Sequence, residues 1–170
     1  MMKTLAKTLL ATALISTSAM AAEVGFYGGG GLAFEAVPDT ADLKMGLGVV
    51  LRGGMTLDSL LENFAVEVEI TKSVIDPKFE RPGSDIKYNV TTLATYAVYR
   101  INIVDDFYVK PRFGVIFPNL GDDMVNSRDI TFSSGIGGGY SVMENLDVYV
   151  DYTVLGEGVT NYGAGVEYHF

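Results

Sequence analysis

The last ten residues of the chain, Asn161 to Phe170, read N-Y-G-A-G-V-E-Y-H-F and show the alternation of a β-strand. One side carries Tyr162, Ala164, Val166, Tyr168 and Phe170, and the other carries Gly163, Gly165, Glu167 and His169. Because this strand reaches the final residue, we expect a neighbouring strand to hold it. The simplest neighbour is the first strand of a closed barrel.

The first 21 residues have the features of an export signal and not of the fold. Lys3 and Lys7 precede a short apolar segment at residues 9–15, and Ala19-Met20-Ala21 forms an A-x-A cleavage site. The apolar segment is too short to span a bilayer as a helix. We therefore expect a signal peptide over residues 1–21 and one domain over residues 22–170.

The composition excludes several classes of protein. Without Lys3 and Lys7 the 12 basic residues become 10, which against 21 acidic residues gives a net charge of −11. So acidic a chain has no basic patch to neutralise phosphates, and we expect no nucleic-acid partner. The chain has no cysteine, so it is neither a lipoprotein nor a disulfide scaffold.

The chain is hydrophobic, yet its apolar residues do not form long runs. Hydrophobic residues make up 48% of it and the mean hydropathy is +0.25, while no window after residue 21 holds about 18 consecutive apolar residues. A transmembrane β-barrel reconciles these facts, because its strands place apolar residues at alternate positions.

Eight segments alternate in this way. We predict strands over residues 24–35, 43–54, 64–74, 88–102, 107–117, 129–142, 146–155 and 161–170. The connections at 104–106 and 143–145 are tight, whereas those at 37–42, 75–87 and 118–128 are longer. Short connections at one rim and longer ones at the other are typical of an eight-stranded antiparallel up-and-down outer-membrane barrel. Both chain ends would then lie at the periplasmic rim.

Three local features carry their own predictions. Residues 55–63 connect two strands and include one helical turn that Asp58 would cap. Pro111 lies inside a predicted strand, where it favours a bulge or kink. Gly28 to Gly31 could form a phosphate-binding loop, but no helix start follows it, so we interpret it as a bend in a curved strand.

The aromatic residues of the apolar face gather at the strand ends, as they do where a bilayer meets water. A secreted lipocalin-like barrel would also alternate, but its apolar face would enclose a ligand and its aromatics would not be sorted to the ends. We therefore expect the apolar face to contact lipid. One predicted girdle contains Phe26, Phe64, Tyr99, Phe107, Tyr140, Tyr168 and Phe170, and the other contains Phe34, Phe117, Phe132 and Tyr162.

The polar face carries charges of both signs in its periplasmic half and mainly Gly, Ser and Thr in its outer half. A narrow barrel is filled by side chains, so we predict a cup closed below by paired charges. An alternative stays open, in which the ion pairs exchange partners and gate a pore for small ions. The predicted lumen charge network is Arg52, Glu67, Glu69, Arg100, Lys110, Arg112, Asp147, Asp151 and Glu167.

The chain resembles the small eight-stranded outer-membrane barrels similar to the OmpA transmembrane domain, often grouped as porin-family proteins. The most specific part of the resemblance is a C-terminal assembly signal, which finds Gly165, Tyr168 and Phe170 in place and departs at Gly163. The resemblance implies a Gram-negative cell envelope protein, most simply a monomer, among outer-membrane lipid and lipopolysaccharide. It also implies that the barrel-assembly machinery receives the C-terminal strand.

Three kinds of activity can be compared on these residues. Some relatives modify lipids, but the only histidine, His169, would lie at the periplasmic rim, away from an outer-leaflet substrate, so we expect no enzyme and no catalytic residue. We also expect no cofactor and no metal site: Asp122-Asp123 could help to hold a divalent ion, but two acidic residues in a loop are more often just solvated. A structural role and an adhesion or surface-interaction role through the loops both remain open.

Overall fold

The computed structural model describes residues 24–36, 45–75, 78–81, 84–87, 90–120, 130–155 and 159–170. The predicted signal peptide at residues 1–21, its cleavage site and Asp122-Asp123 lie outside these ranges. Within the described ranges, no helix is both long and apolar enough to cross a membrane.

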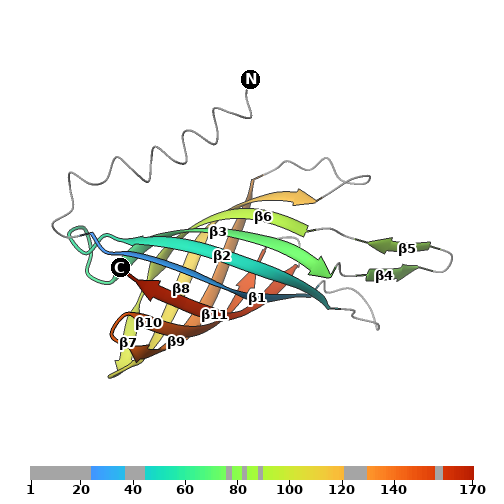
Figure 1. Ribbon diagram of the computed structural model, residues 1–170. Helices are drawn as coiled ribbons and strands as arrows, with labels where there is room; N and C mark the ends of the chain where they lie inside the picture. Colours follow the sequence, from blue (N-terminus) through green and yellow to red (C-terminus); the bar gives the residue numbers. More distant parts are fainter. Residues whose placement is uncertain are drawn as a thin grey trace.

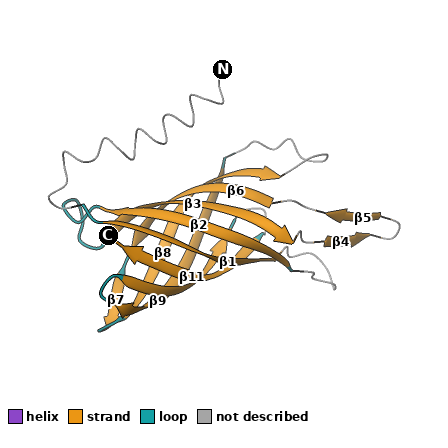
Figure 2. Ribbon diagram, viewed as in Figure 1, coloured by secondary structure: helices purple, strands orange, loops and turns teal. Residues whose placement is uncertain are grey.

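The described residues form eleven strands joined by turns (Figure 2). In chain order they are β1 (Phe26–Ala36), β2 (Gly46–Thr56), β3 (Phe64–Ile75), β4 (Lys78–Arg81), β5 (Ser84–Lys87), β6 (Val90–Tyr99), β7 (Ile101–Val104), β8 (Phe107–Leu120), β9 (Thr131–Met143), β10 (Leu146–Val154) and β11 (Thr160–His169).

The first and last barrel strands close the sheet on itself. β1 pairs antiparallel with β11 from Tyr27 opposite His169 to Ala36 opposite Thr160. The sheet runs in the order β6-β3-β2-β1-β11-β10-β9-β8-β7, and β6 also pairs with β8. Since β6 and β7 are two parts of one strand, the nine strands of this sheet form an eight-stranded antiparallel barrel (Figure 1). The predicted fold class is confirmed.

The two rims of the barrel differ. The turn rim holds the connections 57–63, 105–106 and 144–145, together with Phe26 and Phe170. The loop rim is the opposite end, where β1, β3, β8 and β10 finish. Figure 1 shows the C-terminus at the turn rim, with β4 and β5 beyond the loop rim.

Two predicted connections differ from the structure. Residues 78–87, expected to be loop, contain the β4–β5 hairpin, with Lys78 opposite Lys87 and Arg81 opposite Ser84. Residues 57–63 form turns, one of them a helical turn in which the backbone N–H of Leu61 donates to Leu57 O at 3.1 Å, but Asp58 does not cap it. There the Asp58 carboxylate accepts a hydrogen bond of 2.8 Å from the backbone N–H of Asn63. Asn63 has a φ of 63°, a left-handed conformation that Asn tolerates, so Asp58 closes a turn.

Pro111 interrupts the strand beside it and not its own. The ladder of β8 with β9 continues through Pro111 opposite Ile136. On the other side, β8 pairs with β6 up to Val98 opposite Arg112 and with β7 from Ile101 opposite Val109. The interruption at residues 99–100 therefore faces Pro111, which has no N–H to donate. The effect seen beside Pro111 is thus a gap in the pairing of the neighbouring strand, with the same register on both sides of it.

The barrel is polar inside and apolar outside. Val150, Val68 and Val148 are 63%, 39% and 40% exposed on the outer face. Buried charged residues point inward, and beside them a small apolar cluster fills part of the lumen: Tyr27, Ala65, Ala94, Tyr96, Val98 and Ile116. The face predicted as apolar and outward is the exposed face of the structure.

Candidate functional site: the charged lumen

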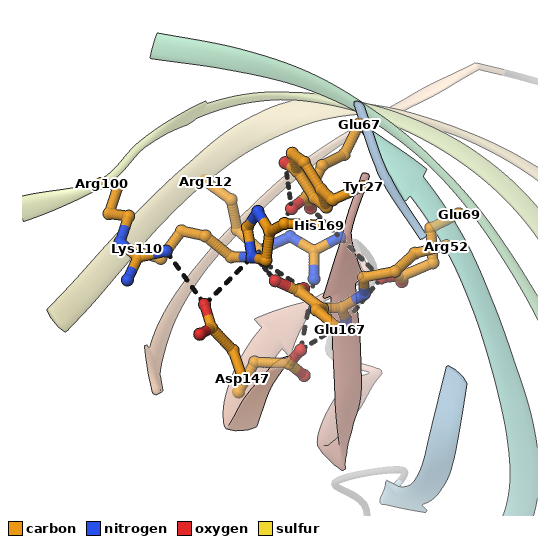
Figure 3. A network of polar contacts seen from close by, with 11 residues as sticks. Tyr27, Arg52, Glu67, Glu69, Arg100, Lys110, Arg112, Asp147, Glu167 and His169 are labelled. Atoms are coloured by element: carbon orange, nitrogen blue, oxygen red, sulfur yellow. Dashed lines mark hydrogen bonds and ion pairs between the residues drawn. The ribbon is translucent and has the colours of Figure 1, made fainter. Parts of the chain in front are cut away.

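All nine residues predicted to line the lumen point into it, and each takes part in at least one ion pair. Arg52 and Glu69 face each other on the neighbouring strands β2 and β3. The other pairs join strands that are not neighbours in the sheet, so they cross the lumen (Figure 3). The alternation of each strand accounts for the inward direction, since every one occupies an inward position of its strand, or, for Arg100, the junction of β6 and β7.

Lys110 lies at the centre of one group. Its Nζ is 2.8 Å from Glu67 Oε1 and 2.7 Å from Glu167 Oε1. Glu67 also accepts a hydrogen bond of 2.8 Å from the Tyr27 hydroxyl. Side chains from β1, β3, β8 and β11 thus meet at one ammonium group, and a buried ammonium needs such partners because water cannot reach it.

Two arginines form a second group next to the first. Glu69 Oε2 is 2.9 Å from Arg52 Nη2 and 2.8 Å from Arg112 Nη2. Asp151 Oδ2 also pairs with both arginines. Arg52 joins the two groups, because its Nη1 lies 3.1 Å from Glu167 Oε1.

The third group lies at the turn rim and is partly open to solvent. Arg100 Nη1 is 2.9 Å from Asp147 Oδ2, and the Nε2 atom of His169 is 3.1 Å from the same oxygen. Arg100 also donates to Ser141 Oγ and to Asn102 Oδ1, each at 3.1 Å. The His169 ring stacks on Tyr27 with 5.3 Å between centroids. His169 is therefore a residue of the lumen mouth.

Each of the four basic residues of the network lies over its own tyrosine ring. The guanidinium carbon lies 4.1 Å from the ring centroid in the Arg52–Tyr149 pair and 3.7 Å in both Arg100–Tyr108 and Arg112–Tyr96. The Lys110 ammonium is 5.5 Å from the centroid of Tyr27. These distances fall within the range of cation–π attraction. This one-to-one pairing was not predicted from the sequence.

Every one of these tyrosines is opposite a glycine on a neighbouring strand. A Cβ added at Gly54 would overlap the Tyr27 ring, and one at Gly139 would overlap the ring of Tyr108. Because glycine has no side chain, these positions leave room for the tyrosine rings. Glycines scattered over the inward positions of the sequence could have suggested such gaps. The register pairs are Tyr27 with Gly54, Tyr96 with Gly114, Tyr108 with Gly139, and Tyr149 with Gly139 and Gly165.

The lumen half near the loop rim is mainly uncharged but is not lined by small residues alone. Tyr96 and Ser133 are hydrogen-bonded at 3.1 Å, and Ser133 donates to the carbonyl of Val154 at 2.7 Å. Glu35, which the sequence prediction did not include, is fully buried and accepts a bond of 2.6 Å from Ser73. Its inward position follows from alternation with Ala33, so the sequence contained the signal.

Asp147, Glu167 and His169 form a candidate metal cluster, since one ligand atom from each lies within 4.8 Å of the others. Basic side chains already occupy the surroundings of both carboxylates. Arg100 pairs with Asp147, and both Lys110 and Arg52 pair with Glu167. A cation would have to displace them, so the cluster is better suited to ion pairing than to metal binding.

The predicted girdle residues lie at the two ends of the outer face. Phe64 is opposite Tyr99 and Phe107 is opposite Tyr140 near the turn rim, and Phe34 is opposite Tyr162 near the loop rim. Tyr168 and Phe170 pack edge to face with centroids 5.2 Å apart. Tyr152, 5.1 Å from Tyr162, extends the loop-rim group and was not predicted as part of it.

This arrangement of polarity defines a class of protein. A closed barrel with exposed apolar strand faces and buried ion pairs reverses the polarity of a water-soluble barrel. The protein is therefore a transmembrane β-barrel.

The sequence model of the outer membrane protein beta-barrel domain matches residues 8–170. The chain belongs to this family, and its place is the outer membrane. The comparison with curated protein sequences finds no match.

Solved structures of similar fold come from several sources. Neisserial surface protein A is 15% identical, with 85% of this chain and 95% of that chain covered and a TM-score of 0.55. Ail, the attachment invasion locus protein of Yersinia pestis, is 16% identical in its complex with the heparin analogue sucrose octasulfate, with 87% and 99% covered and a TM-score of 0.58. OprG of Pseudomonas aeruginosa is 16% identical, with 86% and 95% covered and a TM-score of 0.52. At these identities the likeness concerns the fold alone.

Proposed function

We propose that this protein is a structural component of the outer membrane whose lumen is closed on the periplasmic side by its charge network. The observation that carries the proposal is the three-way contact of Lys110 with Glu67 and Glu167 across the barrel. Side chains from four strands meet there.

The packing around the network supports a closed lumen. The gap lined by Arg52, Lys110, Arg112, Tyr149 and Asp151 does not admit a water-sized sphere. Each of the nine charged side chains has at least one partner of opposite sign within the lumen. A hydrated ion crossing this layer would have to separate several buried pairs, each in a low dielectric.

Conductance in planar bilayers tests this proposal. The wild-type barrel is expected to give no steady single-channel current, whereas Arg52→Ala removes the side chain that joins two groups of the network and should admit small ions. Glu67→Ala is the matched variant on the acidic side. Steady wild-type currents that either variant abolishes or enlarges would favour the alternative function, a small-ion pore gated by exchange of ion pairs.

The same proposal includes an orientation and a set of partners. The signal peptide at residues 1–21 would direct export, and the turn rim with both chain ends would face the periplasm. The apolar outer face would contact outer-membrane lipid and lipopolysaccharide, and the barrel would be a monomer. The assembly machinery would receive β11 through Gly165, Tyr168 and Phe170. Cysteine labelling of whole cells tests the orientation, because the chain has no cysteine of its own.

A second candidate function is adhesion or surface interaction. The observation that favours it is the β4–β5 hairpin, which extends beyond the barrel at the loop rim and contains Lys78, Arg81 and Lys87 (Figure 1). Ail, of similar fold, was solved in complex with a sulfated heparin analogue. Binding of wild-type cells to heparin-coated beads, lost when residues 78–87 are replaced by a short Gly-Ser turn, would support this function. A lipid-modifying activity is the least supported class, and an altered lipid A mass spectrum in a deletion strain would revive it.

A further inference from the structure

We infer that Lys72 binds a phosphate group of lipopolysaccharide at the outer-leaflet surface of the barrel. This inference rests on the proposed orientation, in which the loop rim faces outward. It concerns the outer face of the barrel and does not depend on whether the lumen is closed.

Lys72 is exceptional on its face of the barrel. It is exposed, and among the described barrel strands it is the one charged residue at an outward position. It follows Val66, Val68 and Ile70 on the outer side of β3, so its stem continues the surface that contacts lipid. A charge on this face is tolerated only near the ends of the apolar band.

Lys72 lies near such an end of β3, with the exposed Val74 and Ile75 beyond it. Phe64, at the turn rim, and Lys72 are eight residues apart on the strand. At about 3.4 Å per residue and a tilt of about 40°, this spacing is roughly 21 Å along the membrane normal. The apolar band of such barrels is about 25 Å tall. The Lys72 side chain can therefore reach from the edge of the band to the headgroups.

One neighbouring strand, β6, shows the same boundary, whereas on the other side Lys72 is opposite Val49 of β2. Lys72 is opposite Thr91 on β6, and Thr91 is opposite Asn119 on β8. The adjacent outward row nearer the membrane centre is entirely apolar, with Ile70 opposite Leu93 and Leu93 opposite Phe117. Lys72 and Thr91 thus place two residues that can donate hydrogen bonds side by side, where headgroup oxygens would meet the barrel.

Basic residues outside the lumen fall at this rim alone, although the loop-rim connections of the sequence also contain nine acidic residues: Asp39, Asp42, Asp76, Glu80, Asp85, Asp122, Asp123, Asp129 and Glu157. Of the 10 basic residues after position 21, four belong to the lumen network. The other six all fall in or beside the loop-rim connections of the sequence: Lys44, Lys72, Lys78, Arg81, Lys87 and Arg128. The described turn-rim connections contain Asp58, Glu62, Asp105, Asp106 and Glu144 and no basic residue. Phosphate is the anionic group that lipid A presents at this depth.

Thermal unfolding in nonionic detergent tests the inference, with the loss of the compact barrel band on gels as the measurement. Phosphorylated lipopolysaccharide is expected to raise the wild-type midpoint by about 3 °C or more. Lys72→Gln and Lys72→Glu should lose this shift, and Lys72→Arg should keep it. Dephosphorylated lipid A, phosphatidylglycerol and inorganic phosphate should each give a smaller shift or none.

Two results would overturn the inference: an undiminished shift in Lys72→Gln, or an equal shift with phosphatidylglycerol or dephosphorylated lipid A. All variants must first show the compact band without added lipid, which separates loss of binding from loss of folding. Conductance and cysteine labelling report on the proposed function separately. A conducting barrel or a reversed orientation would therefore be recognised as such and not mistaken for loss of lipid binding.

Discussion

Lys110 on β8 and Glu167 on β11 form a bidentate contact across the lumen, with the ammonium nitrogen 2.7 Å from one carboxylate oxygen and 3.0 Å from the other. The two strands are separated by β9 and β10 in the sheet. The contact therefore links opposite walls of the barrel, which backbone hydrogen bonds between adjacent strands cannot do. Because both groups are buried, removing either one should strongly lower the free energy of unfolding.

Lys110→Met should be strongly destabilising, because it leaves Glu67 without its closest cation and Glu167 with only Arg52. Loss of one partner of a buried pair costs about 3–5 kcal/mol. Urea unfolding in lipid vesicles measures the loss. Lys72→Met, the same substitution on the outer face, is the control and should change stability little. Adding Glu167→Gln to Lys110→Met should recover part of the lost stability. Equal effects of the two Lys→Met variants would contradict a stabilising role of the buried ion pairs.

Gly54→Ala should destabilise the barrel, whereas Gly53→Ala should not. An added Cβ at Gly54 would overlap the Tyr27 ring, while at Gly53 the nearest atom would be a backbone oxygen at 3.9 Å. The ring would have to leave Glu67 and Lys110, so we expect a loss of about 1–3 kcal/mol for Gly54→Ala. The two variants carry the same chemical change on adjacent residues of β2, so the comparison by urea unfolding isolates the space inside the lumen.

The hydroxyls of Tyr96 and Tyr149 should contribute differently to the free energy of unfolding. Tyr96 bonds to Ser133, whereas the buried Tyr149 hydroxyl has no hydrogen-bond partner in the structure. Tyr96→Phe should therefore lose about 1 kcal/mol of unfolding free energy, and Tyr149→Phe should be close to neutral. Both variants keep the ring beside its arginine. A larger loss for Tyr149→Phe than for Tyr96→Phe would show that the Tyr149 hydroxyl has a partner, such as an ordered water.

Val150→Arg should lower the free energy of unfolding from a bilayer by about 2–4 kcal/mol, which is the value for a charge near the midplane of the lipid face. Val150 is 63% exposed and lies midway along β10. In a water-soluble barrel the same exposed position would accept arginine at almost no cost. Val150→Leu serves as the control. A neutral Val150→Arg variant would mean that hydrocarbon does not surround this face.

Phe170→Ala should reduce the amount of folded barrel in the outer membrane more than it reduces stability in vitro. The Phe170 side chain is 83% exposed, and its backbone N–H bonds to Phe26 O at 2.9 Å whatever the side chain. Immunoblots of outer-membrane fractions measure assembly, and refolding into vesicles measures stability. Tyr162→Ala, at the other end of β11, should leave assembly near the wild-type level. Equal assembly of the two variants would remove the signal role of Phe170.

The sequence by itself determined the strands, their faces and the closure of the barrel, because alternation with a period of two is a local property of each strand. Asp147, Tyr149 and Asp151 could be assigned inward positions from β10 alone. Predictions that depended on a neighbouring segment of chain were wrong. The ladder of β8 with β9 continues through Pro111, while the pairing on its other side is interrupted. Strands β4 and β5 pair with each other as a hairpin.

Only the tertiary structure decided which charges meet and which glycines make room for which rings. Lys110 finds Glu67 and Glu167, and Tyr27 covers Gly54, because the stagger of eight tilted strands sets the height of every inward residue. No single strand contains that stagger, since it is the sum of all the registers around the closed sheet. The alternation of residues therefore predicts which side chains face the lumen, and closure of the barrel decides which of these side chains are in contact.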